Sequence, residues 1–488
     1  MDEESRYEAV CSRDARFDGE FFFAVATTGI YCRPSCPAVT PKRRNVRFYP
    51  TAAAAQRGGF RACRRCRPDA VPGSAEWNAR ADVVGRAMRL ISDGVVDREG
   101  VAGLAVRLGY SARQVQRQLN AELGAGPVAL ARAQRAHTAR VLLQTTELPV
   151  ADVAFAAGFA SVRQFNDTIR EIYAATPSEL RVARHGAGGR SGERSRVEGP
   201  GGVPLRLAYR GRYAAAELFD FLAQRAVAGV EEVTGERGHR TYRRTLRLPH
   251  AWGVAEVAED AGDRGWLACR LRLGELQDLT TATQRIRRLL DLDADPYAVT
   301  ERLGADPVLG DLVARRPGMR APGAADPAEL AVRAVLGQGL PVAEARRLGG
   351  ALVAAYGEPL PAPDGGLTRL FPSMAVLAEA PLAEPDMPEE RRAAVRALAA
   401  ALADGSVCLD AGVDREQAER ELLALPGVGA WTAGYIRMRA LGDPDVLPAG
   451  DAAVRAGLRE LGAAPGAAEG WRPWRSYAMH HLWHRDPR

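Results

Sequence analysis

Two short segments decide the amino-terminal fold of this 488-residue chain: Ile30-Tyr-Cys-Arg-Pro-Ser-Cys36 and Arg61-Ala-Cys-Arg-Arg-Cys66. They hold four cysteines as Cys32-x3-Cys36 and Cys63-x2-Cys66. This spacing is typical of a tetrahedral zinc site, because each short loop turns both of its sulfurs onto one ion. Basic residues crowd the flanks: Arg33, Lys42, Arg43, Arg44, Arg47, Arg61, Arg64, Arg65 and Arg67. A thiolate cluster within a basic surface, which attracts phosphate groups, predicts metal chemistry on nucleic acid.

The bulk composition fits a multidomain protein with a polyanionic partner. Hydrophobic residues make up 47% of the chain. A chain of 488 residues with this content is long enough for about three or four domains, each with its own hydrophobic core. The net charge of +6 and the pI of about 9.0 add a mild bias towards nucleic acid. The acidic start has no apolar signal core, and no run of about 18 apolar residues occurs. We therefore expect a cytoplasmic protein with no membrane partner.

The fold class expected is multidomain, mainly α with α+β parts. We expect a small zinc domain at 1–74, an all-α DNA-binding domain at 75–184, a glycine-rich flexible linker at 185–201, a strand-rich α+β domain at 202–275 and an all-α domain at 276–488.

The helical middle contains the same arrangement twice. A glycine turn at Gly109 precedes Ser111, and a second turn at Gly158 precedes Ser161. Glycine permits the left-handed turn, and serine caps the helix that follows. The second helix of each unit carries polar residues that can read base edges: Arg113, Gln114, Gln116 and Arg117, then Arg163, Gln164 and Asn166. A lone unit of this kind is more often a hairpin that only packs, but the pair resembles the AraC-type DNA-binding domain.

The segment from Phe22 to Cys36, together with Gly59 to Asp69, resembles the amino-terminal domain of Ada-type proteins. This resemblance implies that one zinc ion is held by the four cysteines and that Cys32 accepts a methyl group from a DNA methylphosphotriester. It also implies conversion to a transcriptional activator that works with RNA polymerase. The neighbouring arginines Arg33, Arg43, Arg44 and Arg47 are the expected phosphate contacts. The alternative is a purely structural zinc site, which is the usual role of four cysteines.

The carboxyl half contains a glycine hairpin, Leu425-Pro-Gly-Val-Gly429, between two expected helices. Gly427 and Gly429 let backbone amides approach a phosphate beside a helix N-terminus, although such a pattern alone can be a plain helix–helix turn. Asp451 follows this hairpin, and an aromatic segment runs from Trp471 to Trp483. Over residues 201–488 the chain resembles the AlkA-type helix-hairpin-helix glycosylases for alkylated bases, whose first part is a TBP-like α+β domain.

The glycosylase resemblance implies roles for individual residues. Asp451 is expected to stabilise the positively charged sugar as the base departs, or to direct a water. Met319 is expected to wedge into the duplex. The expected base pocket comprises Phe221, Trp431, Tyr435 and Trp483. Aromatic faces attract cationic alkylated purines such as 3-methyladenine. The resemblance also implies a monovalent cation near Leu423, Leu425 and Val428.

Several positions qualify this interpretation. Lys42 is the only lysine in the chain, so a lysine Schiff base cannot form in the carboxyl half and a monofunctional glycosylase is expected. Leu340-Pro341 replaces a polar residue and serine, and proline can begin the next helix. Ala452 stands where relatives often have an aromatic residue, which leaves base preference open.

The rival hypothesis is a DNA-binding regulator with a structural zinc site and no glycosylase activity.

Overall fold

The computed structural model describes residues 1–70, 82–186, 202–260, 262, 264–448, 450–464 and 466–484. The chain forms two compact units, Met1–Tyr209 with Arg270–Gln284, and Arg210–Cys269 with Arg285–Arg488. The turn expected at 71–74 and residues 187–201 of the expected linker lie outside the described residues. Within the described part, every helix is too short or too polar to span a bilayer.

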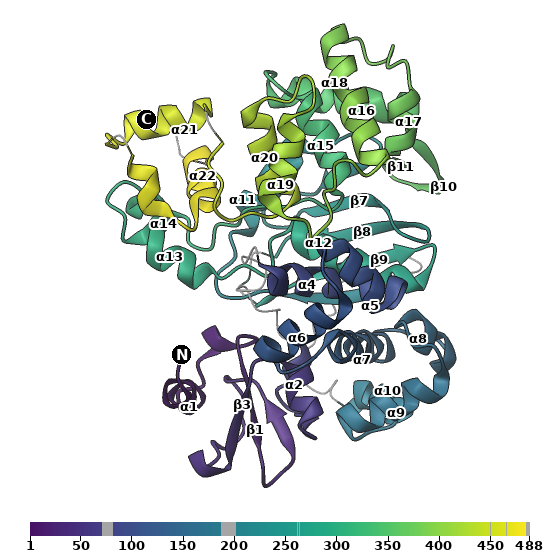
Figure 1. Ribbon diagram of the computed structural model, residues 1–488, viewed down its shortest axis with the longest axis vertical. Coiled ribbons are helices and arrows are strands. Elements are labelled where there is room, and N and C mark those ends of the chain that lie inside the picture. The colour runs from purple at the N-terminus through teal and green to yellow at the C-terminus, as the bar shows by residue number, and fades with distance from the viewer. Residues whose placement is uncertain are drawn as a thin grey trace. The chain divides into compact units, whose positions relative to one another are not determined.

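The amino-terminal part is a small sheet with helices (Figure 1). Its elements are α1 (Glu3–Cys11), η1 (Ala15–Phe17), β1 (Phe22–Val25), β2 (Ile30–Cys32), η2 (Arg43–Asn45), β3 (Val46–Tyr49), α2 (Ala52–Arg57), β4 (Arg61–Ala62) and η3 (Pro68–Ala70). The strand order is β3-β1-β2-β4. Strand β1 pairs antiparallel with β2 and β3, whereas β2 and β4 run parallel. Parallel pairing places the ends of β2 and β4, and the cysteines at those ends, at one edge.

The next part is helical and contains both expected helix-turn-helix units. Its elements are α4 (Val83–Ser92), α5 (Val95–Leu108), α6 (Ala112–Leu123), α7 (Pro127–Thr145), α8 (Val150–Ala156), α9 (Val162–Tyr173) and α10 (Pro177–Gly186). Gly109 and Gly158 adopt φ of 76° and 86°, in the left-handed region that glycine tolerates. The Ser111 hydroxyl accepts from the backbone amide of Gln114, and the Ser161 hydroxyl accepts from the backbone amide of Gln164. The predicted helix caps are therefore confirmed.

The strand-rich part contains β5 (Val203–Ala208), α11 (Ala215–Arg225), β6 (Glu231–Thr234), β7 (Thr241–Arg247), β8 (Trp252–Ala258) and β9 (Trp266–Leu273). The strand order is β5-β9-β8-β7-β6. The two segments predicted as strands from their alternation are β5 and β9. In β5 the alternate residues Val203, Leu205 and Leu207 are buried, as a strand with one covered face requires.

The remainder is helical with one exception. Its helices are η4 (Leu276–Asp278), α12 (Leu279–Leu289), α13 (Pro296–Gly304), α14 (Gly310–Arg315), α15 (Pro327–Leu336), α16 (Val342–Tyr356), α17 (Met374–Glu379), α18 (Glu389–Ala403), α19 (Arg415–Leu423), α20 (Ala430–Ala440), α21 (Ala452–Glu460), η5 (Ala467–Trp471) and α22 (Arg475–Trp483). The exception is a hairpin of β10 (Glu358–Asp364) and β11 (Leu367–Leu370). The predicted multidomain, mainly helical fold class is confirmed, with this hairpin added.

Candidate functional site

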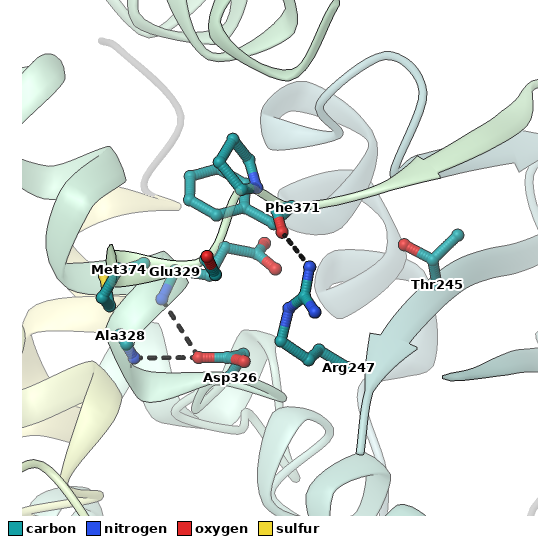
Figure 2. Close-up of a pocket in the computed structure, with 9 residues that line it drawn as sticks. Thr245, Arg247, Asp326, Ala328, Glu329, Phe371 and Met374 are labelled. Carbon is teal, nitrogen blue, oxygen red and sulfur yellow. Dashed lines mark hydrogen bonds between the residues drawn. The ribbon is translucent and has the colours of Figure 1, made fainter. Parts of the chain in front are cut away.

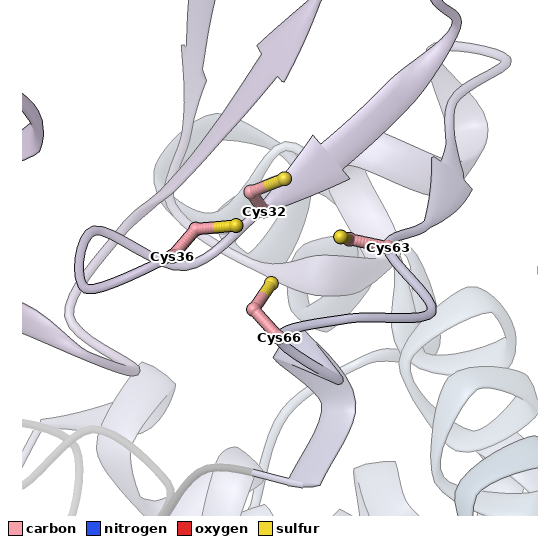
Figure 3. A group of neighbouring side chains, drawn as sticks. All are labelled: Cys32, Cys36, Cys63 and Cys66. Atoms are coloured by element: carbon pink, nitrogen blue, oxygen red, sulfur yellow. The ribbon is translucent and has the colours of Figure 1, made fainter. Parts of the chain in front are cut away.

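The sheet itself assembles the four cysteines. Cys32 is the last residue of β2, and Cys63 directly follows β4. The Cys63 amide donates to the Tyr31 carbonyl over 3.0 Å, which continues the parallel pairing to the cysteines. The four sulfurs lie within 4.8 Å of one another and converge from a strand end and two loops (Figure 3). The predicted ligand set is therefore brought together.

The chemistry of this donor set fits Zn²⁺. All four cysteines are buried, with exposures between 4% and 8%. The three neighbouring thiols, together with burial, raise the pKa of the Cys32 thiol, so sulfurs this close cannot all be anions without a cation. A divalent ion compensates the four negative charges, and four thiolates are a typical zinc ligand set. Exposure does not single out Cys32 from the other three.

The basic residues around the cluster differ in their surroundings. Arg33 forms an ion pair with Asp18 at 3.1 Å, and Arg43 forms one with Glu3 at 2.6 Å. Arg44 and Arg47 are exposed. Arg44 and Arg47 therefore present guanidinium groups that a phosphate can reach directly, whereas Arg33 and Arg43 must share theirs with carboxylates.

The expected base-reading side chains lie on α6 and α9. Those exposed to solvent are Arg113, Gln114, Gln116, Arg117, Arg163 and Gln164, while Asn166 is half-buried. The side-chain Oε1 of Gln114 accepts from the Ser111 backbone amide and hydroxyl, at 3.0 and 2.7 Å, in a capping box. Gln114 therefore supports its helix as well as being available at the surface.

The cysteine-bearing part contacts the carboxyl ends of α6 and α9. Arg57 donates to the Gly124 carbonyl, just after α6, at 2.8 Å. Arg64, between the second pair of cysteines, donates to the Ala174 carbonyl, just after α9, at 2.6 Å. Guanidinium groups at these positions compensate the partial negative charge of each helix end. Neither contact was predicted from the sequence.

A buried carboxylate, Asp69, anchors the same contact. It accepts from Arg140 of α7 at 2.7 Å and from the Tyr173 hydroxyl of α9 at 2.8 Å. Burial is the largest single influence and favours the neutral acid, but the Arg140 charge, His137 and the Tyr173 hydroxyl together outweigh it and hold the pKa of Asp69 well below its usual range. The Arg140 ion pair and the Tyr173 hydrogen bond therefore link the cysteine loop to α7 and α9.

We expect Asp69→Ala to destabilise this region by about 3 kcal/mol or more, because it leaves the Arg140 charge buried without its partner. Since the pKa of Asp69 is depressed in the folded state, its stabilisation is present at neutral pH and is lost as the pH falls below about 4. Hydrogen exchange of residues 61–70 and 162–173 at pH 7 measures the effect. Glu171→Gln, which removes the exposed ion pair with Arg132, is the control and should change stability by less than about 1 kcal/mol. Equal exchange in both variants would contradict the anchoring role of Asp69.

In the second unit, the glycine hairpin lies between α19 and α20. Gly427 has φ of 80°, and a Cβ added there would lie 2.6 Å from the Ala394 Cβ, so only glycine fits. Gly429 is the N-cap of α20, and both glycines are exposed. The amides at this helix start are therefore accessible to a phosphate. A cation near Leu423, Leu425 and Val428 stays a prediction.

Asp451 sits at the start of α21 and is surrounded by donors. Its Oδ1 accepts from the Val454 amide at 2.8 Å, as the N-cap of α21, and from the Trp483 indole at 3.3 Å. Its Oδ2 accepts from the Trp431 indole at 3.0 Å. Asp451 is only 7% exposed. Three helices, α20, α21 and α22, thus converge on one carboxylate.

The four expected pocket aromatics lie together. Trp431 stacks on Tyr435 with centroids 5.0 Å apart and an interplanar angle of 11°, and Tyr435 lies 6.4 Å from Trp483. Phe221 of α11 stacks on Trp483 at 6.4 Å. Phe221 is 2% exposed, whereas the other three are half-buried. The half-buried rings are the ones that an incoming base can reach, and Phe221 supports them from behind.

Three residues that the sequence interpretation missed complete this cluster. The guanidinium carbons of Arg225 and Arg439 lie 3.8 and 4.7 Å from the Phe221 ring centroid, and Arg439 donates to the Tyr435 hydroxyl at 2.7 Å. Burial alone would raise the pKa of Tyr435, but these two charges lower it. His480 packs edge-on against Trp483 at 5.0 Å. Arg225 lies four residues after Phe221 on α11, and Arg439 lies four residues after Tyr435 on α20. Residues at this spacing share a helix face, so the sequence contained a signal for these two contacts.

The remaining predicted positions have distinct environments. Met319 is 5% exposed, so a wedging role would require its side chain to leave this position. Helix α16 starts directly after Pro341, which confirms that the Leu340-Pro341 departure preserves the helix. Ala452 is exposed at the start of α21 and adds no ring beside Asp451.

A separate hollow in the same unit does not coincide with these residues (Figure 2). Its polar lining already has structural partners. Arg247 donates to the Phe371 carbonyl at 3.2 Å, Asp326 caps α15, and Glu329 pairs with Arg244 at 2.6 Å. These groups hold the sheet against α15, so the cluster around Asp451 is the stronger candidate for chemistry.

Comparison with known proteins finds three domain families along the chain. Residues 5–69 match the metal binding domain of Ada, residues 104–183 a helix-turn-helix domain, and residues 204–326 the AlkA N-terminal domain.

Relatives match both halves of the chain. The "DNA-3-methyladenine glycosylase 2" of Escherichia coli is 35% identical, covering 57% of this chain and 96% of that protein. The E. coli "Bifunctional transcriptional activator/DNA repair enzyme Ada" is 34% identical, covering 37% of this chain and 49% of that protein. The "Probable bifunctional transcriptional activator/DNA repair enzyme AlkA" of Mycobacterium tuberculosis is 54% identical, covering 99% of this chain and 96% of that protein. The chain therefore belongs to the family of fused Ada–AlkA transcriptional activators and DNA repair enzymes.

Proposed function

We propose that the protein removes two kinds of alkyl damage from DNA. Its first part accepts a methyl group from a methylphosphotriester on Cys32, and its second part excises alkylated purines of the 3-methyladenine type. The observation that carries the second activity is the Asp451 carboxylate, held between two pocket indoles at a helix start. The convergence of the four cysteine sulfurs supports the first.

Methyl transfer requires one nucleophile and no water. The Cys32 sulfur attacks the methyl carbon, the carbon–oxygen bond breaks, and its electron pair returns to the phosphate oxygen. The product is a thioether, so each protein acts once. A bound zinc ion keeps the four sulfurs deprotonated at neutral pH. Four thiolates around Zn²⁺ would carry a net charge of about −2, and methylation of Cys32 would remove one of these negative charges.

The same reaction acts as a switch. Loss of one negative charge near DNA phosphates reduces repulsion and tightens binding, which favours operator occupancy by α6 and α9. We infer that the bound protein then recruits RNA polymerase as an activator. Reduced thiols and a DNA substrate both favour a cytoplasmic location.

Base excision uses a different part of the chain. The damaged nucleotide leaves the stack, and its base lies against the half-buried Trp431, Tyr435 and Trp483. The glycosidic bond then breaks with its electron pair going to the base, and the Asp451 carboxylate stabilises the positive sugar until water adds. Because residues 202–488 contain no lysine, a lysine-dependent strand cleavage cannot follow, and the enzyme is monofunctional.

The test uses the full-length, zinc-loaded protein on two substrates. Duplex DNA containing 3-methyladenine should release the free base without strand scission, and an undamaged duplex should release none. DNA carrying methylphosphotriesters should add one methyl group to the Cys32 peptide, as seen by mass spectrometry. No release and no methyl transfer would leave a DNA-binding regulator with a structural zinc site.

A further inference from the structure

Asp451 uses most of its hydrogen-bonding capacity on neutral donors. A carboxylate offers about four acceptor sites, two on each oxygen. Both sites of Oδ1 are taken, by the Val454 amide and the Trp483 indole. One site of Oδ2 is taken by the Trp431 indole. Among the described residues, the open acceptor site therefore lies on Oδ2.

We propose that Trp431 and Trp483 are positioning residues whose indole N–H groups aim the open side of Oδ2 at the sugar. This inference rests on the proposed glycosylase function, and it gives the two rings a role separate from stacking against the base. Trp431 fixes the oxygen that carries the charge to the substrate. Trp483 and the helix start fix the other oxygen and so prevent rotation of the carboxylate.

The two indoles are themselves held in place. Trp431 stacks on Tyr435, and Trp483 stacks on Phe221. His480 packs edge-on against Trp483, and burial together with the Arg439 charge holds the pKa of His480 well below its usual range. Neutral, buried packing of this kind keeps the indole orientation fixed, which positioning requires.

Neutral donors suit this task better than charged ones. A guanidinium bound to Asp451 would cancel the negative charge that must face the developing sugar cation. The two nearby arginines bind elsewhere: Arg439 donates to Tyr435 and to the Gly323 carbonyl, and Arg225 donates to the Phe221 carbonyl. The cluster therefore orients the carboxylate with tryptophans and leaves its charge uncompensated.

The experiment replaces one N–H by sulfur without changing the ring shape. We would introduce 3-benzothienylalanine separately at positions 431 and 483 of the full-length protein. One readout is single-turnover release of 3-methyladenine. The other is affinity for duplex DNA containing a pyrrolidine abasic analogue, which carries a cation at the sugar and has no base. Because hydrogen bonds to charged groups contribute strongly, each replacement should lower both quantities by roughly tenfold or more.

The matched control is the same replacement at Trp471. Its indole nitrogen is buried and has no hydrogen-bond partner among the described residues, so neither readout should change. Trp431→Phe, a smaller ring without the N–H, gives a second variant and should also weaken pyrrolidine binding. A role in base stacking alone predicts unchanged pyrrolidine affinity in all of these variants, and that result would overturn the inference. If the wild-type protein releases no base, the proposed glycosylase function fails instead.

Discussion

Asp451→Asn should reduce the rate of 3-methyladenine release by at least about a hundredfold, while affinity for undamaged duplex stays within about twofold. Asparagine has nearly the same shape, and its carbonyl oxygen can still accept from the Val454 amide or an indole. What it lacks is the full negative charge that stabilises the sugar cation, and removal of one such electrostatic group typically costs 10²–10³ in rate. Single-turnover kinetics with an excess of protein measures this step directly.

The control for this variant is Asp414→Asn. Asp414 also caps a helix in the second unit, accepting from the Glu416 and Gln417 amides at the start of α19, and the aromatic cluster is not among its partners. Its variant should release base at nearly the wild-type rate. If Asp451→Asn retained the wild-type rate, the carboxylate would be only a helix cap, and the search for the catalytic group would have to begin again.

The parts of the site that could be predicted from the sequence are those encoded by local spacing. Cys32-x3-Cys36 and Cys63-x2-Cys66 each make a loop that needs little from the rest of the chain, and the structure brings all four sulfurs together. The same holds for the turns at Gly109 and Gly158, where the residue type is dictated by a left-handed backbone. The convergence of Asp451 with four aromatics, in contrast, came from family resemblance, because no spacing rule links α11 to α22.

What could not be predicted depends on tertiary contacts. The four-residue spacing places Arg225 and Arg439 on the helix face of Phe221 and Tyr435, but their contacts with these rings are visible only in the folded structure. Asp69 read as the end of the cysteine motif, and its burial depends on Arg140 and Tyr173, more than seventy residues away in sequence.

The hairpin β10–β11 was missed for a related reason. Prolines at 359, 361 and 363 normally argue against a strand. Pro359 lies opposite Arg369, and the register then shifts before Asp364 pairs with Leu367, so the prolines at 361 and 363 fall where the pairing is irregular. Such a strand is acceptable at the end of a sheet, where one edge has no partner strand, but a proline-rich sequence gives no sign that a partner is present.

The second large effect is expected at the other end of the chain. Cys32→Ala should abolish methyl transfer from methylphosphotriester DNA, from one methyl group per protein to none, because the reacting sulfur is gone. It should also weaken zinc retention, since three cysteines remain of a four-cysteine cluster. Base release by the second unit should continue at the wild-type rate, because Cys32 is remote in sequence from Asp451 and takes no part in that reaction.

Mass spectrometry of peptides decides whether Cys32 alone reacts. The four cysteines differ by only a few per cent in exposure, so accessibility in the free protein does not select one of them. Cys32 differs in being part of a strand, paired with Phe23, whereas Cys36, Cys63 and Cys66 lie outside the strands. A sulfur on a fixed strand end can be presented to a DNA backbone in one orientation, as in-line attack requires. Cys11→Ala, which removes an exposed cysteine outside the cluster, is the control and should still accept one methyl group. Methylation of Cys36, Cys63 or Cys66 in place of Cys32 would show that the strand position does not select the nucleophile.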